Sequence, residues 1–457
     1  MTKPIPPLDL LWLLIESPGS TTHVGALLLF KKPAGRRTLV REIVETYRAA
    51  KPAPPFNYVP ELLTGGAPHF REVAGWDPHY HIEHLALPKG ASYDDLLHLV
   101  AELHEPTLDR DRPLFRCWVI DRVPGGMFAI YTKTHHSIVD GASGMQILYA
   151  GLAKSARRKA PIPGFGLGVP APKPRPPQPF MERISAPLLA AITQVGAVSD
   201  VSLGALRKTV AGLTGARLEG SLPFTAQHAP TNEPLRMART FATLSLPLEE
   251  MHDVGRHFGA TLNDVAATIV DAGLHRYLNE TGRAFAHRFN AFIPVSLRAD
   301  GDTAIGTRVS AMFVPLGEPA APAPERLRQV VASIASGKQE LRAMSKDAAM
   351  TYAVGIVGLA GLAASTHLDR VGHPAANLVI SNVPGARETR YLNGARLVGI
   401  YPISALAASI GLNATLTSYH DRMDFGFIAN AVPLYDLPQL ARHTLAAYKE
   451  LKAAAGK

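Results

Sequence analysis

The chain has 457 residues, of which 47% are hydrophobic, so it can bury large cores and is not expected to be disordered over most of its length. Its single cysteine, Cys117, excludes an intramolecular disulfide framework and fits a reducing, cytoplasmic compartment, and no apolar stretch is long enough to span a bilayer. The formal net charge of +9 favours an anionic partner, either a membrane surface or a phosphorylated small molecule. Nucleic acid is disfavoured, because aromatic residues make up only 7% and no nucleic-acid-binding motif accompanies the charge.

The N-terminal part of the chain is predicted to alternate between strands and helices. The apolar run from His23 to Phe30 predicts a buried strand, and the helical periodicity from Thr38 to Ala50 predicts an amphipathic helix. Residues His79 to Leu87 alternate like a strand, which would divide their histidines between opposite faces and so disfavours a shared metal. Ser92 and Asp95 form a capping-box pattern that predicts the start of another helix.

A predicted hairpin carries the most distinctive stretch of the sequence. Two β-prone runs, Leu114 to Val123 and Met127 to Thr134, flank Pro124-Gly125-Gly126, which is a strong turn signal. The second run leads into THHSIVDG (residues 134–141), and a helix is predicted from Ala142 to Leu152. Histidine is the side chain whose ordinary pKa allows proton transfer near neutral pH. The pair is therefore either a catalytic site or a structural pair at a strand-to-helix corner, and the stretch alone favours neither interpretation.

The second half of the chain repeats this mixture of strands and helices. Proline and glycine dominate from Pro161 to Pro179, which predicts the main linker, and helical material is expected between Met181 and Leu218. Asn393-Gly394 predicts a hairpin turn. The predicted strands are 239–246, 288–297, 308–316, 377–381, 412–419 and 423–429, and the predicted helices are 247–258, 261–278, 324–344, 346–368 and 437–454.

Several common catalytic arrangements are missing from the sequence. It has no G-x-S-x-G elbow of serine hydrolases, no Walker A loop and no H-E-x-x-H pair. A metal site built from His135, His136 and Asp140 is disfavoured, because adjacent residues on a strand point to opposite faces. What remains is base catalysis, in which a histidine takes the proton of a hydroxyl that attacks an activated acyl donor such as a thioester.

The stretch HHSIVDG (residues 135–141) resembles the HHxxxDG motif of coenzyme A-dependent acyltransferases and of peptide-synthetase condensation domains. Further motifs, in order over nearly the whole chain, are similar to those of one branch, the bacterial wax ester synthase/diacylglycerol acyltransferase family. They are PLD (7–9), HVG (23–25), PLF (113–115), VID (119–121), LNDV (262–265), IPVSLR (293–298), ISNVPG (380–385), YLNGA (391–395) and YPIS (401–404). Phe115 and Thr307 depart from the pattern, since many relatives carry Trp and Asn there, so no chain-length preference is transferred.

The resemblance implies a mixed α/β fold of the chloramphenicol-acetyltransferase type, in which each of two domains has a mixed β-sheet with flanking helices and the active-site tunnel lies between them. The expected division is an N-terminal acyltransferase domain at 1–160, a linker at 161–232 and a C-terminal acyltransferase domain at 233–457.

The resemblance also implies roles for individual residues. His136 would be the general base, His135 would support it, Asp140 would hold the corner, and Gly141 would allow close approach of the backbone. The candidate substrate contacts are Asn263, Asp264, Ser381 and Asn382. Helix capping is the alternative for the first two, and turn chemistry is the favoured explanation for the Pro384-Gly385 pair that follows the last two. No metal is expected.

The implied activity is transfer of a fatty acyl group from acyl-CoA, a co-substrate and not a bound cofactor, to a long-chain alcohol or to diacylglycerol. The alternatives are another acceptor, such as an amine or a polyketide hydroxyl, and a non-catalytic lipid-surface protein. A cytoplasmic protein is expected, either a monomer or a homodimer, that associates peripherally with the inner membrane or with lipid droplets.

Overall fold

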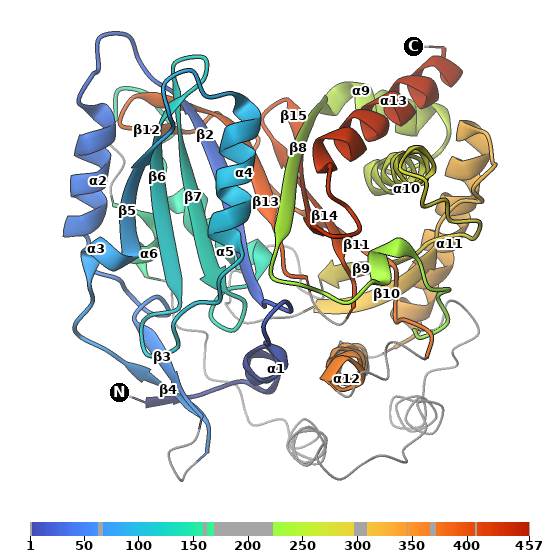
Figure 1. Ribbon diagram of the computed structural model, residues 1–457, viewed down its shortest axis with the longest axis horizontal. Helices are drawn as coiled ribbons and strands as arrows, with labels where there is room; N and C mark the ends of the chain where they lie inside the picture. Colours follow the sequence, from blue (N-terminus) through green and yellow to red (C-terminus); the bar gives the residue numbers. More distant parts are fainter. Residues whose placement is uncertain are drawn as a thin grey trace.

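Two mixed sheets lie side by side and divide the described part of the chain into an N-terminal and a C-terminal half (Figure 1). The computed structural model describes residues 2–62, 67–158, 162–168, 223–296, 309–344, 346–365, 372–406 and 409–456. Most of the predicted linker, including the helical material expected between Met181 and Leu218, lies outside these ranges. The mixed α/β fold expected from the sequence is confirmed.

The N-terminal sheet has the strand order β12-β13-β2-β7-β6-β5, and its neighbours are antiparallel except for the parallel pair of β5 and β6. Its strands are β2 (His23–Lys31), β5 (Ile82–Ala86), β6 (Phe115–Val123), β7 (Met127–His135), β12 (Tyr391–Leu392) and β13 (Ala395–Ile403). The helices of this half are α1 (Pro7–Ile15), α2 (Leu39–Ala49), α3 (Pro78–His81), α4 (Tyr93–His104), α5 (Gly141–Ala150) and α6 (Gly164–Leu167). A small antiparallel sheet joins β1 (Thr2–Pro4), β4 (His69–Glu72) and β3 (Tyr58–Glu61).

The C-terminal sheet has the order β10-β9-β11-β14-β15-β8, in which β11 runs parallel to both of its neighbours. Its strands are β8 (Arg239–Pro247), β9 (Asn290–Ser296), β10 (Val309–Pro315), β11 (Leu378–Val383), β14 (Leu412–Tyr419) and β15 (Arg422–Asn430). The helices are α9 (Leu248–His257), α10 (Leu262–Glu280), α11 (Ala323–Ala343), α12 (Lys346–Ser365) and α13 (Leu437–Ala454), preceded by the 3-10 turn Pro230–Asn232. Helices α10 and α13 pack together on the face of this sheet that points away from the N-terminal half (Figure 1).

One strand of the C-terminal part completes the N-terminal sheet. Strand β13 pairs antiparallel with β2 from Arg396 opposite Lys31 to Ile403 opposite Gly25. The predicted hairpin turn before it is present, and Asn393 and Gly394 both adopt positive φ values, 48° and 91°, which is why this pair of residue types suits the turn. The domain boundaries at 160 and 233 stay a prediction, because the strand pairing joins residues 391–403 to the first part of the chain.

The two sheets meet through a buried layer that contains both apolar and polar contacts. Helix α4 lies between the N-terminal sheet and β8, and its apolar face packs with residues of both halves. Asp424 of β15 is fully buried, and its carboxylate accepts hydrogen bonds from the Ser245 hydroxyl at 2.5 Å and from the Ile400 N–H of β13 at 2.9 Å. A Cβ added to Gly426 would lie 1.9 Å from the Pro402 carbonyl oxygen, so glycine is required for this close approach of β13 and β15.

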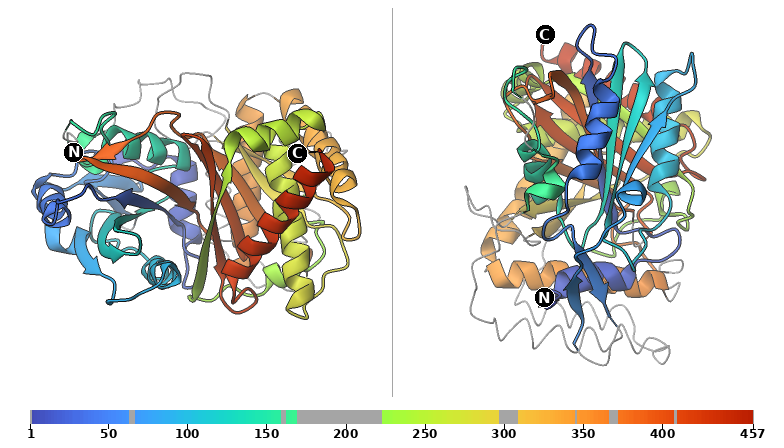
Figure 2. Two further views of the ribbon diagram at one scale, coloured as in Figure 1. Left: turned by 90° about the horizontal axis from the view of Figure 1, so that it is seen from above. Right: turned by 90° about the vertical axis from the view of Figure 1, so that its left-hand side faces the viewer.

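Helices α1 and α12 pack against each other at one end of both sheets (Figures 1 and 2). A Cβ added to Gly361 of α12 would lie 2.6 Å from Ile15 Cγ2, so a small residue is needed at this contact. No helix within the described ranges is both long enough and apolar enough to cross a membrane.

Most locally encoded predictions of strands, helices and caps are confirmed, and the prediction for residues 79–87 is wrong in part. The hairpin of β6 and β7 is present, as is the capping box of Ser92 and Asp95 at α4. The predicted strand from His79 to Leu87 begins only at Ile82, because Asp77 accepts hydrogen bonds from the His79 and Tyr80 N–H groups and starts the short helix α3 instead. His81 is buried, and its Nδ1 contacts the Phe115 carbonyl oxygen at 2.7 Å, so it is a packed structural residue.

Candidate active site

Successive side chains at the end of β7 and just after it point alternately into a cavity and into the buried interior on the other side. Thr132, Thr134 and His136 line a large cavity, whereas Lys133 and His135 are buried on the opposite side. This alternation follows from the period of two along a strand. The two adjacent histidines therefore do not converge on one point.

His136 faces the cavity from a fixed position. Its backbone N–H donates to the Thr22 carbonyl oxygen at 3.0 Å, and its ring stacks on the Trp12 indole with 4.5 Å between centroids and 25° between planes. The Nδ1 atom of His136 is buried and has no hydrogen-bond partner within the described part of the chain. Nε2 is therefore the ring nitrogen that can reach a ligand in the cavity.

The surroundings of His136 favour its neutral form. Burial lowers the pKa of His136 below its ordinary value of 6.5, the Asp140 carboxylate acts in the opposite direction, and His135 lowers the pKa further. A neutral imidazole at neutral pH can accept a proton, which is the state that a general base requires.

Asp140 and Gly141 form the corner between the motif and α5. Asp140 is buried, and its carboxylate accepts a hydrogen bond from the Ser143 N–H at 2.7 Å as the N-cap of the helix. A Cβ added to Gly141 would lie 3.4 Å from Cγ2 of Val383, at the end of β11. The corner therefore lies against the C-terminal half.

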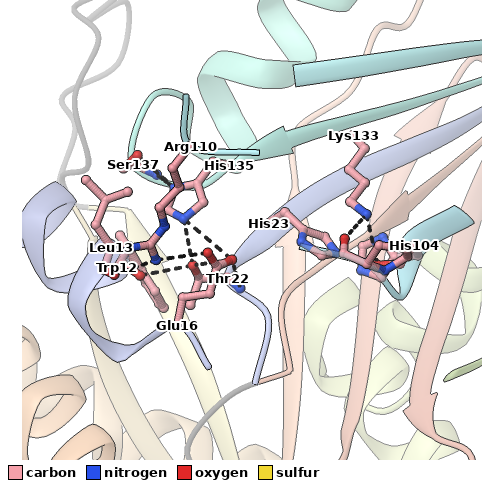
Figure 3. A network of polar contacts seen from close by, with 11 residues as sticks. Trp12, Leu13, Glu16, Thr22, His23, His104, Arg110, Lys133, His135 and Ser137 are labelled. Atoms are coloured by element: carbon pink, nitrogen blue, oxygen red, sulfur yellow. Dashed lines mark hydrogen bonds and ion pairs between the residues drawn. The ribbon is translucent and has the colours of Figure 1, made fainter. Parts of the chain in front are cut away.

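His135 belongs to a buried polar network with the end of α1 (Figure 3). Its Nδ1 accepts from the Ser137 N–H at 3.1 Å, so in the neutral ring the proton resides on Nε2, which lies 3.0 Å from Thr22 Oγ1 and 3.7 Å from a carboxylate oxygen of Glu16. Arg110 donates to the other Glu16 oxygen at 3.0 Å. Burial raises the pKa of Glu16, but His135 and Arg110 more than offset this effect and hold the pKa at about 2. Glu16 is therefore ionised.

Of the four candidate substrate contacts predicted from the sequence, two line the cavity and two do not. Asn382 lines the cavity together with Ser381, and its amide Nδ2 donates to Asn263 Oδ1 at 2.7 Å. Asp264 accepts from the Thr261 N–H at 2.7 Å and forms the capping box of α10, which is the alternative considered for it. Asn263 and Asp264 are not among the residues that line the cavity.

Gly385 lies two residues after the end of β11. A turn is expected from the sequence for the Pro384-Gly385 pair, but the structure gives another reason for the glycine. Its φ is not positive, whereas a Cβ there would lie 1.7 Å from the Ser418 carbonyl oxygen. The glycine therefore permits a close approach between the ends of β11 and β14.

The cavity has a volume of about 340 Å³ and is lined mainly by apolar side chains from both halves. On the N-terminal side these include Trp12, Phe30, Tyr47, Phe56, Phe115 and Phe165, and on the C-terminal side Phe292, Phe313, Ile356, Ala375 and Ile410. An apolar cavity of this kind suits hydrocarbon chains, and His136 supplies a basic nitrogen to it.

Part of the positive charge lies in a cluster of basic residues after α5, and the structure describes this cluster only in part; its members are Lys154, Arg157, Arg158, Lys159, Lys173 and Arg175. Lys154, four residues after the end of α5, pairs with Glu388 at 2.9 Å, and both side chains are exposed. Lys159, Lys173 and Arg175 lie outside the described residues. Within the described ranges, no group of three His, Cys, Asp or Glu residues is arranged to hold a metal ion.

Sequence reasoning missed Trp12, Glu16, Thr22 and Arg110. The apolar run from Leu8 to Ile15 is too short to span a bilayer, and its pattern does not indicate a contact with the histidine motif. One signal for this network was available in the sequence. Glu16 is the single carboxylate between that apolar run and the first predicted buried strand, where an unpaired charge would be costly, so a basic partner could have been expected.

Comparisons with known proteins agree over the length of the chain. The model of the wax ester synthase/diacylglycerol acyltransferase catalytic domain matches residues 5–266, and that of the WS/DGAT C-terminal domain matches residues 305–452. The O-acyltransferase WSD of Acinetobacter baylyi is 30% identical over 436 residues, covering 94% of this chain and 93% of that protein.

Solved structures give the same result. The wax ester synthase/diacylglycerol acyltransferase from Marinobacter aquaeolei VT8 superposes with a TM-score of 0.79 at 28% identity and full coverage of both chains. The first condensation domain of the calcium-dependent antibiotic synthetase shares the fold, with a TM-score of 0.59 at 18% identity, over 100% of this chain and 96% of that one.

Proposed function

Since the chain belongs to the wax ester synthase/diacylglycerol acyltransferase family, we propose that it transfers a fatty acyl group from acyl-CoA to the hydroxyl of a long-chain alcohol or of diacylglycerol, with His136 as the general base. Acyl-CoA is a substrate of this reaction and not a resident cofactor. The observation that carries the proposal is the position of His136, whose Nε2 is the ring nitrogen available to an apolar cavity lined by both halves.

The chemistry follows from the neutral state of this imidazole. Nε2 of His136 takes the proton of the acceptor hydroxyl as its oxygen attacks the thioester carbonyl carbon. The tetrahedral intermediate then breaks its C–S bond, and the coenzyme A thiolate that leaves receives the proton from the imidazolium. The transfer is direct, so no acyl group is attached to the protein. The apolar walls exclude water, which would otherwise compete as the acceptor.

The neighbouring residues support this role without taking the proton. The buried Asp140 carboxylate, which caps α5, favours the protonated form of His136, while His135 is held by Ser137 and Thr22. Asn382 lines the cavity, and its hydrogen bond to Asn263 supports a polar substrate contact at this edge.

A peripheral location on a membrane or a lipid droplet is part of the proposal. It is supported by the net charge of +9, which favours anionic lipid surfaces, and by the insolubility of an ester or triacylglycerol product in water.

The test is the His136→Ala variant, assayed for thiol release from palmitoyl-CoA with hexadecanol or diacylglycerol as the acceptor. Loss of a general base is expected to lower kcat by about 10²- to 10⁴-fold. His98→Ala is the matched control, because His98 is an exposed residue of α4. Turnover of His136→Ala at the wild-type rate would refute the general-base role, and a larger yield of amide than of ester from an acceptor panel would reverse the choice of acceptor.

A further inference from the structure

The contact between α1 and the motif gives Trp12 a role in the reaction. We propose that the face of the Trp12 indole stabilises the imidazolium form of His136 that arises during acyl transfer, so that Trp12 is a positioning residue for the base. This inference rests on the proposed function of His136.

The Trp12 indole is stacked on the His136 imidazole, which is the ring that becomes a cation when it takes the proton. The centroids of the Trp12 indole and the His136 imidazole lie 4.5 Å apart, and their planes differ by 25°. A cation within about 6 Å of the centroid of an indole is attracted by the negative potential of its face. Both rings line the cavity, where water does not screen this attraction as fully as at the surface.

The orientation of Trp12 is not explained by a hydrogen bond of its indole. Its Nε1 is buried and has no hydrogen-bond partner within the described part of the chain. Buried indole N–H groups usually find a partner, because leaving one unpaired is unfavourable. Within the described part of the chain, no hydrogen bond of Nε1 competes with the contact between the indole face and His136.

Side chains of the polar network around Glu16 hydrogen-bond to the backbone of α1 and hold it in place (Figure 3). The carbonyl groups of the last helical turn lack partners within the helix. The Thr22 hydroxyl donates to the Trp12 carbonyl oxygen at 3.0 Å, and Arg110 donates to the Leu13 carbonyl oxygen at 2.7 Å. Since Thr22 also accepts the His136 N–H through its carbonyl oxygen, one residue holds both members of the stack.

The surroundings of His136 disfavour its imidazolium form on balance, because its pKa is lowered from the ordinary value of 6.5. Burial and the neighbouring His135 both disfavour the imidazolium, whereas Asp140 at the N-cap of α5 and a backbone hydrogen bond of His136 itself favour it. On α1 the acidic residues are Asp9 and, at the C-cap, Glu16, which faces His135 and Arg110. The strand from the other half, β11, has no titratable side chain among residues 378–383. The indole face is therefore the neutral group that can offset the loss of solvation.

Fluorinated tryptophan provides the test, because fluorine weakens the potential of the indole face with little change in size. The protein contains three tryptophans and 18 histidines, so 5-fluorotryptophan would be incorporated at all three positions and the histidines labelled with ¹⁵N for titration by NMR. The His136 resonance is identified by its absence in His136→Ala. We expect fluorination to lower the His136 pKa by roughly half a unit and kcat by about threefold.

The control is Trp12→Phe, in which the same labelling reaches only Trp76 and Trp118. The shift on fluorination should vanish there. If fluorination leaves the His136 pKa of the otherwise unchanged protein where it was, the proposal is overturned, whatever the activity of His136→Ala. If the pKa shifts and His136→Ala remains fully active, the stacking is supported and the general-base role fails, so the two ideas are tested separately.

Discussion

Replacing Glu16 with glutamine is expected to destabilise the protein and to remove a defined part of its acid sensitivity. The Glu16 side chain is only 4% exposed, and its carboxylate contacts Arg110 at 3.0 Å and His135 at 3.7 Å. Burial raises its pKa, but the two partners outweigh this and bring the pKa from 4.5 to about 2. The difference, 4.5 − 2, is about 2.5 units and corresponds to about 3 kcal/mol of unfolding free energy at pH 7.

The sign of the pH dependence follows from the depressed pKa of Glu16. The unfolded chain, with a pKa of 4.5 at this group, binds the proton before the folded protein does as the pH falls. The stabilisation is therefore complete above the unfolded-state pKa and declines towards the folded-state pKa, to about 1.5 kcal/mol at pH 3. A glutamine lacks this contribution at every pH, so the difference between the two proteins should narrow on acidification.

Urea denaturation followed by circular dichroism at pH 7, 5, 4 and 3 measures this difference. Glu61→Gln is the matched control, because Glu61 also contacts an arginine, Arg71, and a histidine, His69, but keeps 24% of its side chain exposed at the β3–β4 hairpin. Surface ion pairs contribute little, so the control should resemble the wild type at each pH. A difference for Glu16→Gln that stays constant with pH, or an equal loss at Glu61, would contradict the reasoning.

Two further predictions concern the base and the join between the sheets. Asp140→Asn removes the charge that raises the pKa of His136, so the acid limb of the kcat/KM profile should move to lower pH, and an unchanged or upward limb would argue against this electrostatic role. Gly426→Ala places a Cβ 1.9 Å from the Pro402 carbonyl oxygen and should lower the unfolding free energy by about 1–3 kcal/mol in thermal unfolding. In Gly75→Ala the added Cβ meets no atom within 4 Å, so this control should unfold near the wild-type temperature.

The sequence predicts those features that a few neighbouring residues determine. The Pro124-Gly125-Gly126 turn is one example, since Gly125 and Gly126 both adopt the positive φ values, 77° and 69°, that glycine accommodates. The capping box that begins α10 is another, because Thr261 and Asp264 bond to each other across one turn. The opposite facing of His135 and His136 likewise follows from strand geometry alone.

Contacts between distant segments could not be derived in this way. Thr22 and His135 are 113 positions apart, and nothing in the local pattern of either segment identifies the other as its partner. The stack of Trp12 on His136 depends on where α1 docks, and α1 contacts distant segments, namely α12 of the other half and the residues Thr22 and Arg110. The turn expected at Gly385 failed for the same reason, since the atom that requires the glycine belongs to Ser418.

The pairing of β13 with β2 restricts how this chain can be recombined with its relatives. A chimera that joins the first 160 residues of one parent to the remainder of another would place β13 of the second parent against β2 of the first. Residues 395–403 would then have to fit a foreign edge, and a truncated protein ending before them would expose β2 as an unpaired edge, prone to self-association. Exchanges that preserve function should therefore transfer the 391–403 hairpin together with the N-terminal segment.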